Sequence, residues 1–157
     1  ARLAFRCLDV ADRDETIEVL DLQALITWDP ATDPYPQHAV AFAAAVVDVE
    51  QFVQLDWART QDRILYVRNY QDRTVSEDSA DVGYVDFNTP ATPYRVQLVP
   101  TGEATETHPS WSPDDTRIVL SRNTGKRNGS GLYLVNPDGS GLASLGVRTG
   151  TWPDWAR

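Results

Sequence analysis

Two histidines, one cysteine and 23 acidic residues are the groups in this chain that could support catalysis or metal binding. His38 and His108 do not stand in a metal-ligand spacing, and Cys7 is alone, so it cannot form an internal disulfide. Gly139-Ser140-Gly141 lacks the Gly-x-Ser-x-Gly pattern of a nucleophile elbow and is typical of a turn. The sequence therefore predicts no catalytic residue, no metal ligand and no cofactor. His108 is interpreted as a residue at a strand edge, and Cys7 as a buried, inert thiol.

The acidic residues gather in three clusters, at residues 9–18, 72–81 and 103–106. These clusters lack the glycine turn and the bidentate glutamate of a calcium loop, so we interpret them as solvated loops. The formal net charge is −9, which repels nucleic acid phosphates. The pair Lys126-Arg127 is too small to reverse that repulsion. Nucleic acid is therefore not an expected partner.

Composition is that of a single domain, with 157 residues and 41% hydrophobic content. No apolar run approaches the roughly 18 residues of a membrane span, so membrane insertion is not expected. The nearest candidate, Ala39 to Val49, contains a charge and predicts a buried strand or a short helix. The chain has no methionine and starts at Ala1, which indicates processing or a segment of a longer protein. A periplasmic or extracellular location is expected.

The most informative pattern is a unit that recurs around tryptophan. Trp57 and Trp111 head two copies of it, and an arginine stands at the same distance after each, at Arg63 and Arg117. A third copy begins at Trp155, where Asp154-Trp155-Ala156-Arg157 repeats Asp56-Trp57-Ala58-Arg59 letter for letter. Steps of this length are typical of the blades of a β-propeller, which take roughly 40 to 50 residues each.

The residues after each tryptophan are rich in β-branched and aromatic types, which predicts strands. Asn136 to Gly141 combines proline and glycine in the pattern of a hairpin turn. The expected strands are 2–6, 17–21, 63–67, 82–86, 117–121 and 132–136.

These residues carry a resemblance. His108-Pro109-Ser110-Trp111-Ser112-Pro113-Asp114-Asp115, with the strands and turn after it, resembles the blade motif of TolB-like β-propellers. The resemblance is clear over 107–157, weaker over 53–100 and partial over 1–52. It implies an all-β fold, a partial β-propeller of about three four-stranded antiparallel blades. It also implies structural roles for the motif residues: tryptophan packs between blades, and the Pro-Asp turn links the first two strands. The motif residues are Trp57, Arg63, Trp111, Pro113, Asp114 and Arg117.

The spacing within the repeat also indicates which strands of a blade the two ends of the chain supply. Arg2 and Asp21 have the same separation as Arg117 and Asn136, so residues 1–29 supply the later strands of a blade whose first strand is missing. Residues 151–157 are a first strand whose blade does not continue. Between them we place an insertion at 30–52, a second blade at 53–100 and a third at 107–147.

The two incomplete blades are complementary and predict an interface. We expect Trp152, Pro153, Asp154 and Trp155 to pair with Arg2, Leu3, Ala4 and Phe5 of a neighbour or of the rest of a longer chain. The expected function is a noncatalytic propeller module for protein binding or self-assembly. The alternative is the noncatalytic fragment of a secreted or periplasmic hydrolase or lyase. A third hypothesis, a small-ligand-binding propeller, requires polar side chains that converge on a central channel.

Overall fold

The structure of the chain is a computed structural model. It describes residues 2–8, 15–21, 31, 39–44, 50–71, 78–86, 94–97, 104–126 and 129–155. Side chains are described for residues 31, 54–68, 80–86, 104–126 and 129–155.

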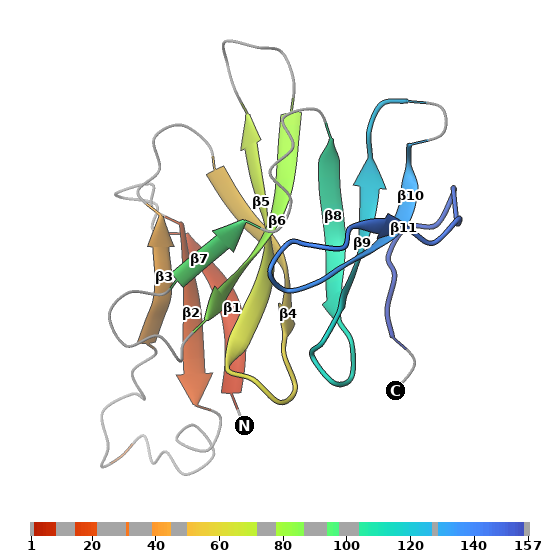
Figure 1. Ribbon diagram of the computed structural model, residues 1–157. Helices are drawn as coiled ribbons and strands as arrows, with labels where there is room; N and C mark the ends of the chain where they lie inside the picture. Colours follow the sequence, from red (N-terminus) through yellow and green to blue (C-terminus); the bar gives the residue numbers. More distant parts are fainter. Residues whose placement is uncertain are drawn as a thin grey trace.

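The described residues form three antiparallel sheets that lie side by side, with no helix among them (Figure 1). In each sheet every strand pairs with the next one along the chain, so the connections are those of a meander. The first sheet contains β1 (Arg2–Leu8), β2 (Glu15–Asp21) and β3 (Ala39–Ala44). The middle sheet contains β4 (Glu50–Trp57), β5 (Arg63–Gln71), β6 (Asp78–Asp86) and β7 (Tyr94–Gln97). The last sheet contains β8 (Thr105–Trp111), β9 (Ile118–Asn123), β10 (Gly131–Val135) and β11 (Ala143–Ser144).

The all-β expectation is confirmed, and so are the strands predicted from the sequence, apart from small differences at their ends. The turn at Asn136 to Gly141 is also confirmed, because Gly139 N–H donates to Asn136 O at 2.9 Å and Asn136 N–H donates to Ser140 O at 2.9 Å. Gly139 has φ 82°, which only glycine adopts at little cost. One segment differs from its expected role as an insertion. Ala39–Ala44 forms β3 and pairs with β2, so this part of 30–52 belongs to the first sheet.

Equivalent residues of the repeat pair in the same way in the middle sheet and in the last sheet. Trp57 pairs with Ile64 in β4–β5, and Trp111 pairs with Ile118 in β8–β9. Both pairs of strands then carry a register shift in the same place, between Val53 and Asp56 and between Thr107 and Ser110. The sequence repeat is therefore a repeat of backbone geometry, bulge included.

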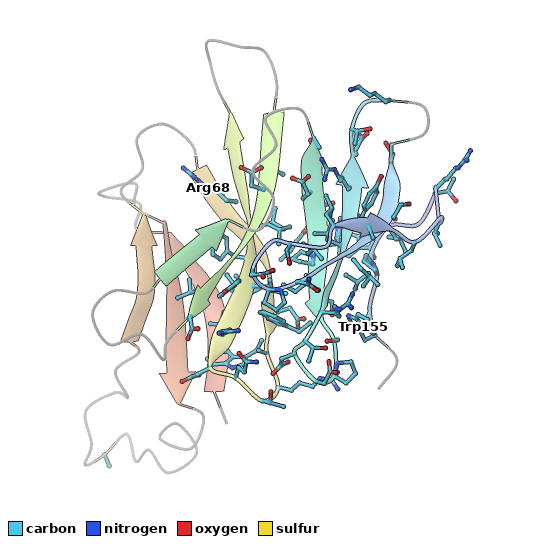
Figure 2. All side chains as sticks on the ribbon, in the orientation of Figure 1. Arg68 and Trp155 are labelled. Atoms are coloured by element: carbon cyan, nitrogen blue, oxygen red, sulfur yellow. The ribbon has the colours of Figure 1, made fainter. Side chains whose placement is uncertain are left out.

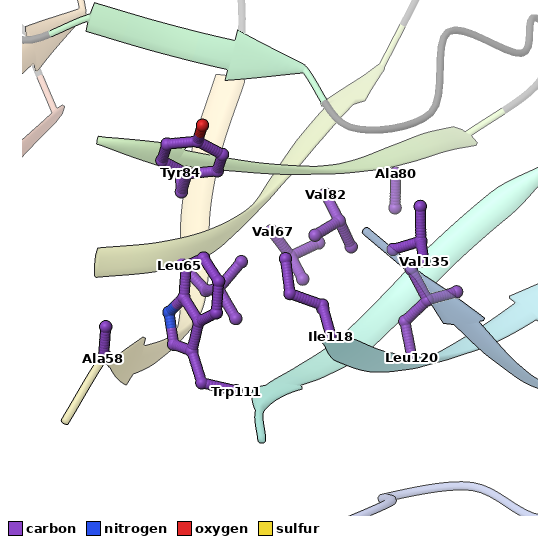
Figure 3. Packing of buried hydrophobic residues seen from close by; sticks show 10 residues of the cluster. All are labelled: Ala58, Leu65, Val67, Ala80, Val82, Tyr84, Trp111, Ile118, Leu120 and Val135. Carbon is purple, nitrogen blue, oxygen red and sulfur yellow. The ribbon is translucent and has the colours of Figure 1, made fainter. Parts of the chain in front are cut away.

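The described core lies between the middle and last sheets (Figure 3). Trp111 at the end of β8 is 2% exposed and packs edge-on against Tyr84 of β6, with ring centroids 5.8 Å apart. Ile118 and Leu120 of β9 are fully buried beside it. Truncation of a buried tryptophan of this kind costs about 3–5 kcal/mol. Trp111 thus packs the last sheet against the middle sheet, which precedes it in the chain. The cluster comprises Ala58, Leu65, Val67, Ala80, Val82, Tyr84, Trp111, Ile118, Leu120 and Val135.

Candidate functional site

Three non-glycine residues with left-handed backbone conformation occupy the same position of the repeat. Gln54 has φ 57°, His108 has φ 53° and Trp152 has φ 61°. Each stands three positions before a repeat tryptophan, at Trp57, Trp111 and Trp155. This conformation is uncommon for residues with a Cβ and costs about 1 kcal/mol or more at each position. At Gln54 and His108 it coincides with the bulge in the strand, which turns the side chain out of the regular alternation.

These three side chains lie in one column. The His108 backbone N–H donates to Gln54 Oε1 at 2.5 Å, and the Gln54 amide nitrogen lies 3.1 Å from His108 Nε2. On its other side the His108 ring lies against the Trp152 indole, with centroids 3.8 Å apart and a tilt of 49°. The column therefore joins β4, β8 and the C-terminal segment.

The hydrogen bonds of His108 fix its protonation state. Gln54 Oε1 accepts the backbone N–H of His108, so it is the NH2 nitrogen of the Gln54 side chain that faces His108 Nε2. Because this nitrogen can only donate, His108 Nε2 accepts the hydrogen bond. The other ring nitrogen, Nδ1, lies 2.9 Å from the Thr107 hydroxyl. Burial lowers the pKa of His108 from its usual value. His108 is therefore held as the neutral ring.

An open pocket of about 430 Å³ lies along this column. Its lining consists of the three residues that precede each repeat tryptophan, which are Gln54, Leu55 and Asp56, then His108, Pro109 and Ser110, then Trp152, Pro153 and Asp154. Two carboxylates are the charged groups of this lining, and it contains no lysine or arginine. The repeat thus brings polar side chains from all three units into one pocket.

Asp56, Ser110 and Asp154 occupy the position directly before each tryptophan. Asp56 Oδ2 accepts a 2.7 Å hydrogen bond from the backbone N–H of Trp111, which ties the middle sheet to the last. The Ser110 hydroxyl lies 3.4 Å from Asp154 Oδ1 and also reaches Asp56. Burial raises the pKa of Asp56, and the nearby charge of Asp154 raises it further, against the opposing effects of the Trp111, Ser110 and Arg59 contacts. Asp56 therefore loses its proton less readily than a solvent-exposed aspartate does.

A second pocket of about 420 Å³ adjoins the first and shares Asp56, Ser110 and Asp154 with it. Trp57, Arg59 and Trp111 complete its lining. The Trp111 indole Nε1–H is buried and has no hydrogen-bond partner within the described part of the chain. The next repeat tryptophan, Trp155, is labelled in Figure 2. It differs from Trp111, because its Nε1 donates to Ser110 O at 3.1 Å.

The motif turn makes a further contact between the two sheets. Asp115 is 1% exposed with φ 56°, and its carboxylate reaches the turn after β4. Oδ1 accepts from Arg59 N at 2.9 Å, and Oδ2 accepts from Thr60 N at 2.5 Å, Thr60 Oγ1 at 2.6 Å and Gln61 N at 3.1 Å. Burial acts to raise the pKa of Asp115, but the bonds from Thr60, Arg59 and Gln61 outweigh it and leave the pKa lowered. We call this contact the Asp115 clasp.

The other predicted motif residues lie in or beside the same turns. Pro113 and Asp114 are exposed in the connection between β8 and β9. Asp114 accepts from the Ser112 and Thr116 hydroxyls at 2.6 and 2.8 Å, which lowers its pKa to about 2.

The two motif arginines have different contacts. Arg63 pairs with Asp86 at 2.7 Å, across the β5–β6 register, and its guanidinium lies 5.2 Å from the centre of the Tyr84 ring. The exposed Arg117 donates its backbone N–H to Ser112 Oγ at 2.9 Å, and its carbonyl accepts from Ser112 N at 2.8 Å.

The residues predicted to form an interface lie on opposite flanks of the middle sheet. Arg2, Leu3, Ala4 and Phe5 belong to β1, an edge strand of the first sheet, and β1 contacts β4. Trp152, Pro153, Asp154 and Trp155 run beside β8 of the last sheet without forming a strand. The structure does not bring the two sets together within one chain (Figure 1).

Sequence reasoning missed Gln54, Asp56 and Ser110 as site residues. Their positions could have been recognised in the sequence, because each residue stands at a fixed distance before an aligned tryptophan. The sequence does not show, however, that the side chains at these positions point toward one another. His38 lies outside the described residues, and the side chain of Cys7 is not described. Within the described residues, no cluster of three or more His, Cys, Asp or Glu side chains could hold a metal ion. No helix in that same part is long and apolar enough to cross a membrane.

Comparison with known proteins identifies no relative: neither a family model nor a curated protein sequence matches this chain.

Proposed function

We propose that this chain is a noncatalytic arc of a β-propeller that assembles with a second copy of itself through its incomplete first sheet. Each sheet corresponds to one blade, and the first strand of the middle and last blades carries the repeat tryptophan. Three sheets of meander order, and a bulge shared at equivalent positions of two repeats, support this assignment. An arc of three blades is short of the four to eight that close a propeller.

The missing strand is the single observation that carries the proposal. The first sheet begins at β1, and its register pairs Arg2 with Asp21. The middle sheet pairs Arg63 with Asp86 in the corresponding strands, and there β4 covers the outer edge of β5. β1 has no such neighbour among the described strands, and its unpaired edge is where we expect a further strand to add. The first sheet is therefore a blade without its first strand.

The C-terminal segment has the sequence of the strand that is absent. By the repeat, Trp155 corresponds to Trp57, and Leu3 corresponds to Ile64. Since Trp57 pairs with Ile64 and Asp56 pairs with Leu65, we expect Trp155 to pair with Leu3 of the second copy and Asp154 with Ala4. Strand addition of this kind satisfies the backbone groups of the open edge. Two arcs joined at both ends give about six blades, within the usual range.

Sedimentation velocity tests the assembly. The wild-type chain should sediment as a dimer of twice 17.5 kDa, and a chain that ends at residue 151 should sediment as a monomer. Trp155→Ala should weaken the dimer at least tenfold, because a tryptophan anchor at an interface contributes about 2 kcal/mol or more. Leu145→Ala is the matched control, since Leu145 is 45% exposed and lies outside the proposed interface. A wild-type chain that remains a monomer at all concentrations would refute assembly between copies.

A further inference from the structure

The sheets lie side by side, so each has one face toward the sheet before it in the chain and one face toward the sheet after it (Figure 1). We call these the preceding face and the following face. Side chains alternate along a strand, so neighbouring residues of β9 belong to opposite faces. Ile118 and Leu120 lie on the preceding face, because they belong to the cluster between the middle and last sheets. Val119 and Ser121 therefore lie on the following face of the last sheet.

Contact between the middle and last sheets buries a following face against a preceding face. Figure 3 shows this contact, in which Trp111 and the preceding face of the last sheet cover four residues of β5 and β6. These four residues form the following face of the middle sheet and are at most 7% exposed: Leu65, Val67, Val82 and Tyr84. The preceding face of the middle sheet is buried too, since Ile64 and Tyr66 are 0% and 2% exposed and β1 and β2 contact β4.

The following face of the last sheet has no further sheet against it among the described strands. Leu132 and Leu134 of β10 belong to this face, because they pair with Ser121 and Val119 of β9. Both leucines are half-buried, and Gly150 lies against the side chain of Leu132. The equivalent positions of the middle sheet are fully covered by the sheet that follows. The last sheet thus presents apolar side chains where the middle sheet has a core.

At the other end of the arc, the first sheet has the matching residues. The register of β1 with β2 is the register of β9 with β10, because Leu3 pairs with Leu20 as Ile118 pairs with Val135. Three residues on the preceding face of the last sheet are 0% exposed: Ile118, Leu120 and Val135. By this register, the first sheet has apolar residues at all three positions, which are Leu3, Phe5 and Leu20. The sequence therefore retains at each end what an intersheet contact requires.

Ser121 adds a polar requirement to this contact. Its side chain lies on a strand residue that is 7% exposed, and its Oγ is buried without a hydrogen-bond partner within the described part of the chain. Val67 takes the same position in the middle sheet, at the same distance after a repeat tryptophan. Tyr133 packs against the cluster that contains Val67, and the register places Glu18 of the first sheet at the position of Tyr133. A buried hydroxyl requires an acceptor, and a carboxylate is one.

We propose that the following face of the last sheet packs on the preceding face of the first sheet of the second copy, where the Ser121 hydroxyl donates to the Glu18 carboxylate. This inference rests on the proposed assembly, which by itself requires only that the C-terminal segment pairs with β1. That segment is already held beside the last sheet, because Trp155 Nε1 donates to Ser110 O. A second copy whose β1 adds to the segment brings its first sheet over this face. The polar pair favours this contact over others, because a mismatched face leaves the hydroxyl or the carboxylate buried alone.

The dissociation constant of the full-length dimer, measured by sedimentation velocity over a dilution series, tests the apolar part. Leu134→Ala should raise it at least tenfold, because a closed dimer contains two equivalent contacts and loses apolar burial at both. Leu145→Ala should leave it unchanged. If the wild-type chain dimerises, the chain that ends at residue 151 does not, and Leu134→Ala dissociates like the wild type, then strand addition stands and the face contact is refuted. A wild-type monomer would overturn both.

A double-mutant cycle tests the polar pair. Ser121→Val installs the residue type found at the equivalent position of β5, so the fold should tolerate it, and it should weaken the dimer at least tenfold because Glu18 loses its donor. Ser144→Val is the matched control, since Ser144 is exposed in β11. Adding Glu18→Tyr, which restores the residue types of the contact within the chain, should recover the affinity lost in Ser121→Val. If Glu18→Tyr changes the dissociation constant by the same factor in the wild type and in Ser121→Val, the pair is refuted.

Discussion

Replacement of Asp115 by alanine should loosen the contact between the middle and last sheets. Asp115 accepts four hydrogen bonds from Arg59, Thr60 and Gln61. Each contributes about 1 kcal/mol net, less than the roughly 1.5–3 kcal/mol usual for a charged acceptor, because Arg59 and Thr60 are exposed and water can replace part of each bond. Asp115→Ala should therefore reduce the free energy of unfolding by about 3–4 kcal/mol. For a domain of this size the melting temperature should fall by about 10 °C.

Chemical unfolding in guanidinium chloride measures this loss. Asp115→Asn should lose less, about 1–2 kcal/mol, because asparagine tolerates the left-handed backbone and keeps one oxygen acceptor. Thr60→Val removes a single bond of the clasp and should cost about 1 kcal/mol in the wild type but little in Asp115→Ala. The double-mutant cycle thus isolates the clasp from general effects of either substitution.

The pH dependence gives an independent check on the same residue. The pKa of Asp115 is lowered in the folded chain, so its contribution is complete above the unfolded pKa of about 3.9 and is lost as pH falls through the folded pKa. The difference in stability between wild type and Asp115→Asn should therefore shrink at acid pH. A loss below about 1 kcal/mol in Asp115→Ala, or additive effects of Thr60→Val, would show that the clasp does not hold the sheets together.

Two further predictions concern the pocket. The pKa of His108 is lowered, so the unfolded chain takes up its proton first and stability should fall as pH drops below about 6.5. His108→Asn should flatten this slope in denaturant titrations at pH 7, 6 and 5, whereas parallel profiles would contradict the neutral ring. The raised pKa of Asp56 means that its charge disfavours the folded state at neutral pH, a penalty that disappears as pH falls through the folded pKa. Asp56→Asn keeps an oxygen for the Trp111 backbone N–H and should unfold at pH 7 with a free energy equal to or above that of the wild type. A loss of more than about 1 kcal/mol at pH 7 would refute that reasoning.

A polar site that lowers stability is expected where function requires an arrangement that folding alone would not favour. Asp56 and the three residues with left-handed backbone, Gln54, His108 and Trp152, fit this pattern, since each raises the free energy of the folded state. Asp115 is the opposite case, because its hydrogen bonds lower the pKa and stabilise the fold. Two acidic residues of neighbouring repeats thus differ in role because their surroundings differ.

The strands could be predicted from local sequence. Arg63–Gln71 and Ile118–Asn123 are rich in β-branched and aromatic residues, and a repeated tryptophan fixes their phase. The hairpin at Asn136 was predictable for the same local reason, since proline and glycine restrict the backbone there. β3 was less clear, because Ala39 to Val49 also suits a short helix, and only its pairing with β2 decides between them.

The sequence by itself determined the repeat and the all-β class, because both follow from residue types at a fixed spacing along the chain. Only the tertiary structure decided that Gln54, His108 and Trp152 form one column, and that Asp115 of one repeat caps the turn of another. The physical reason is that both features join residues 44 to 56 positions apart. A bulge that redirects a side chain, and a carboxylate that meets three backbone N–H groups, depend on how two sheets pack, which local propensity does not specify.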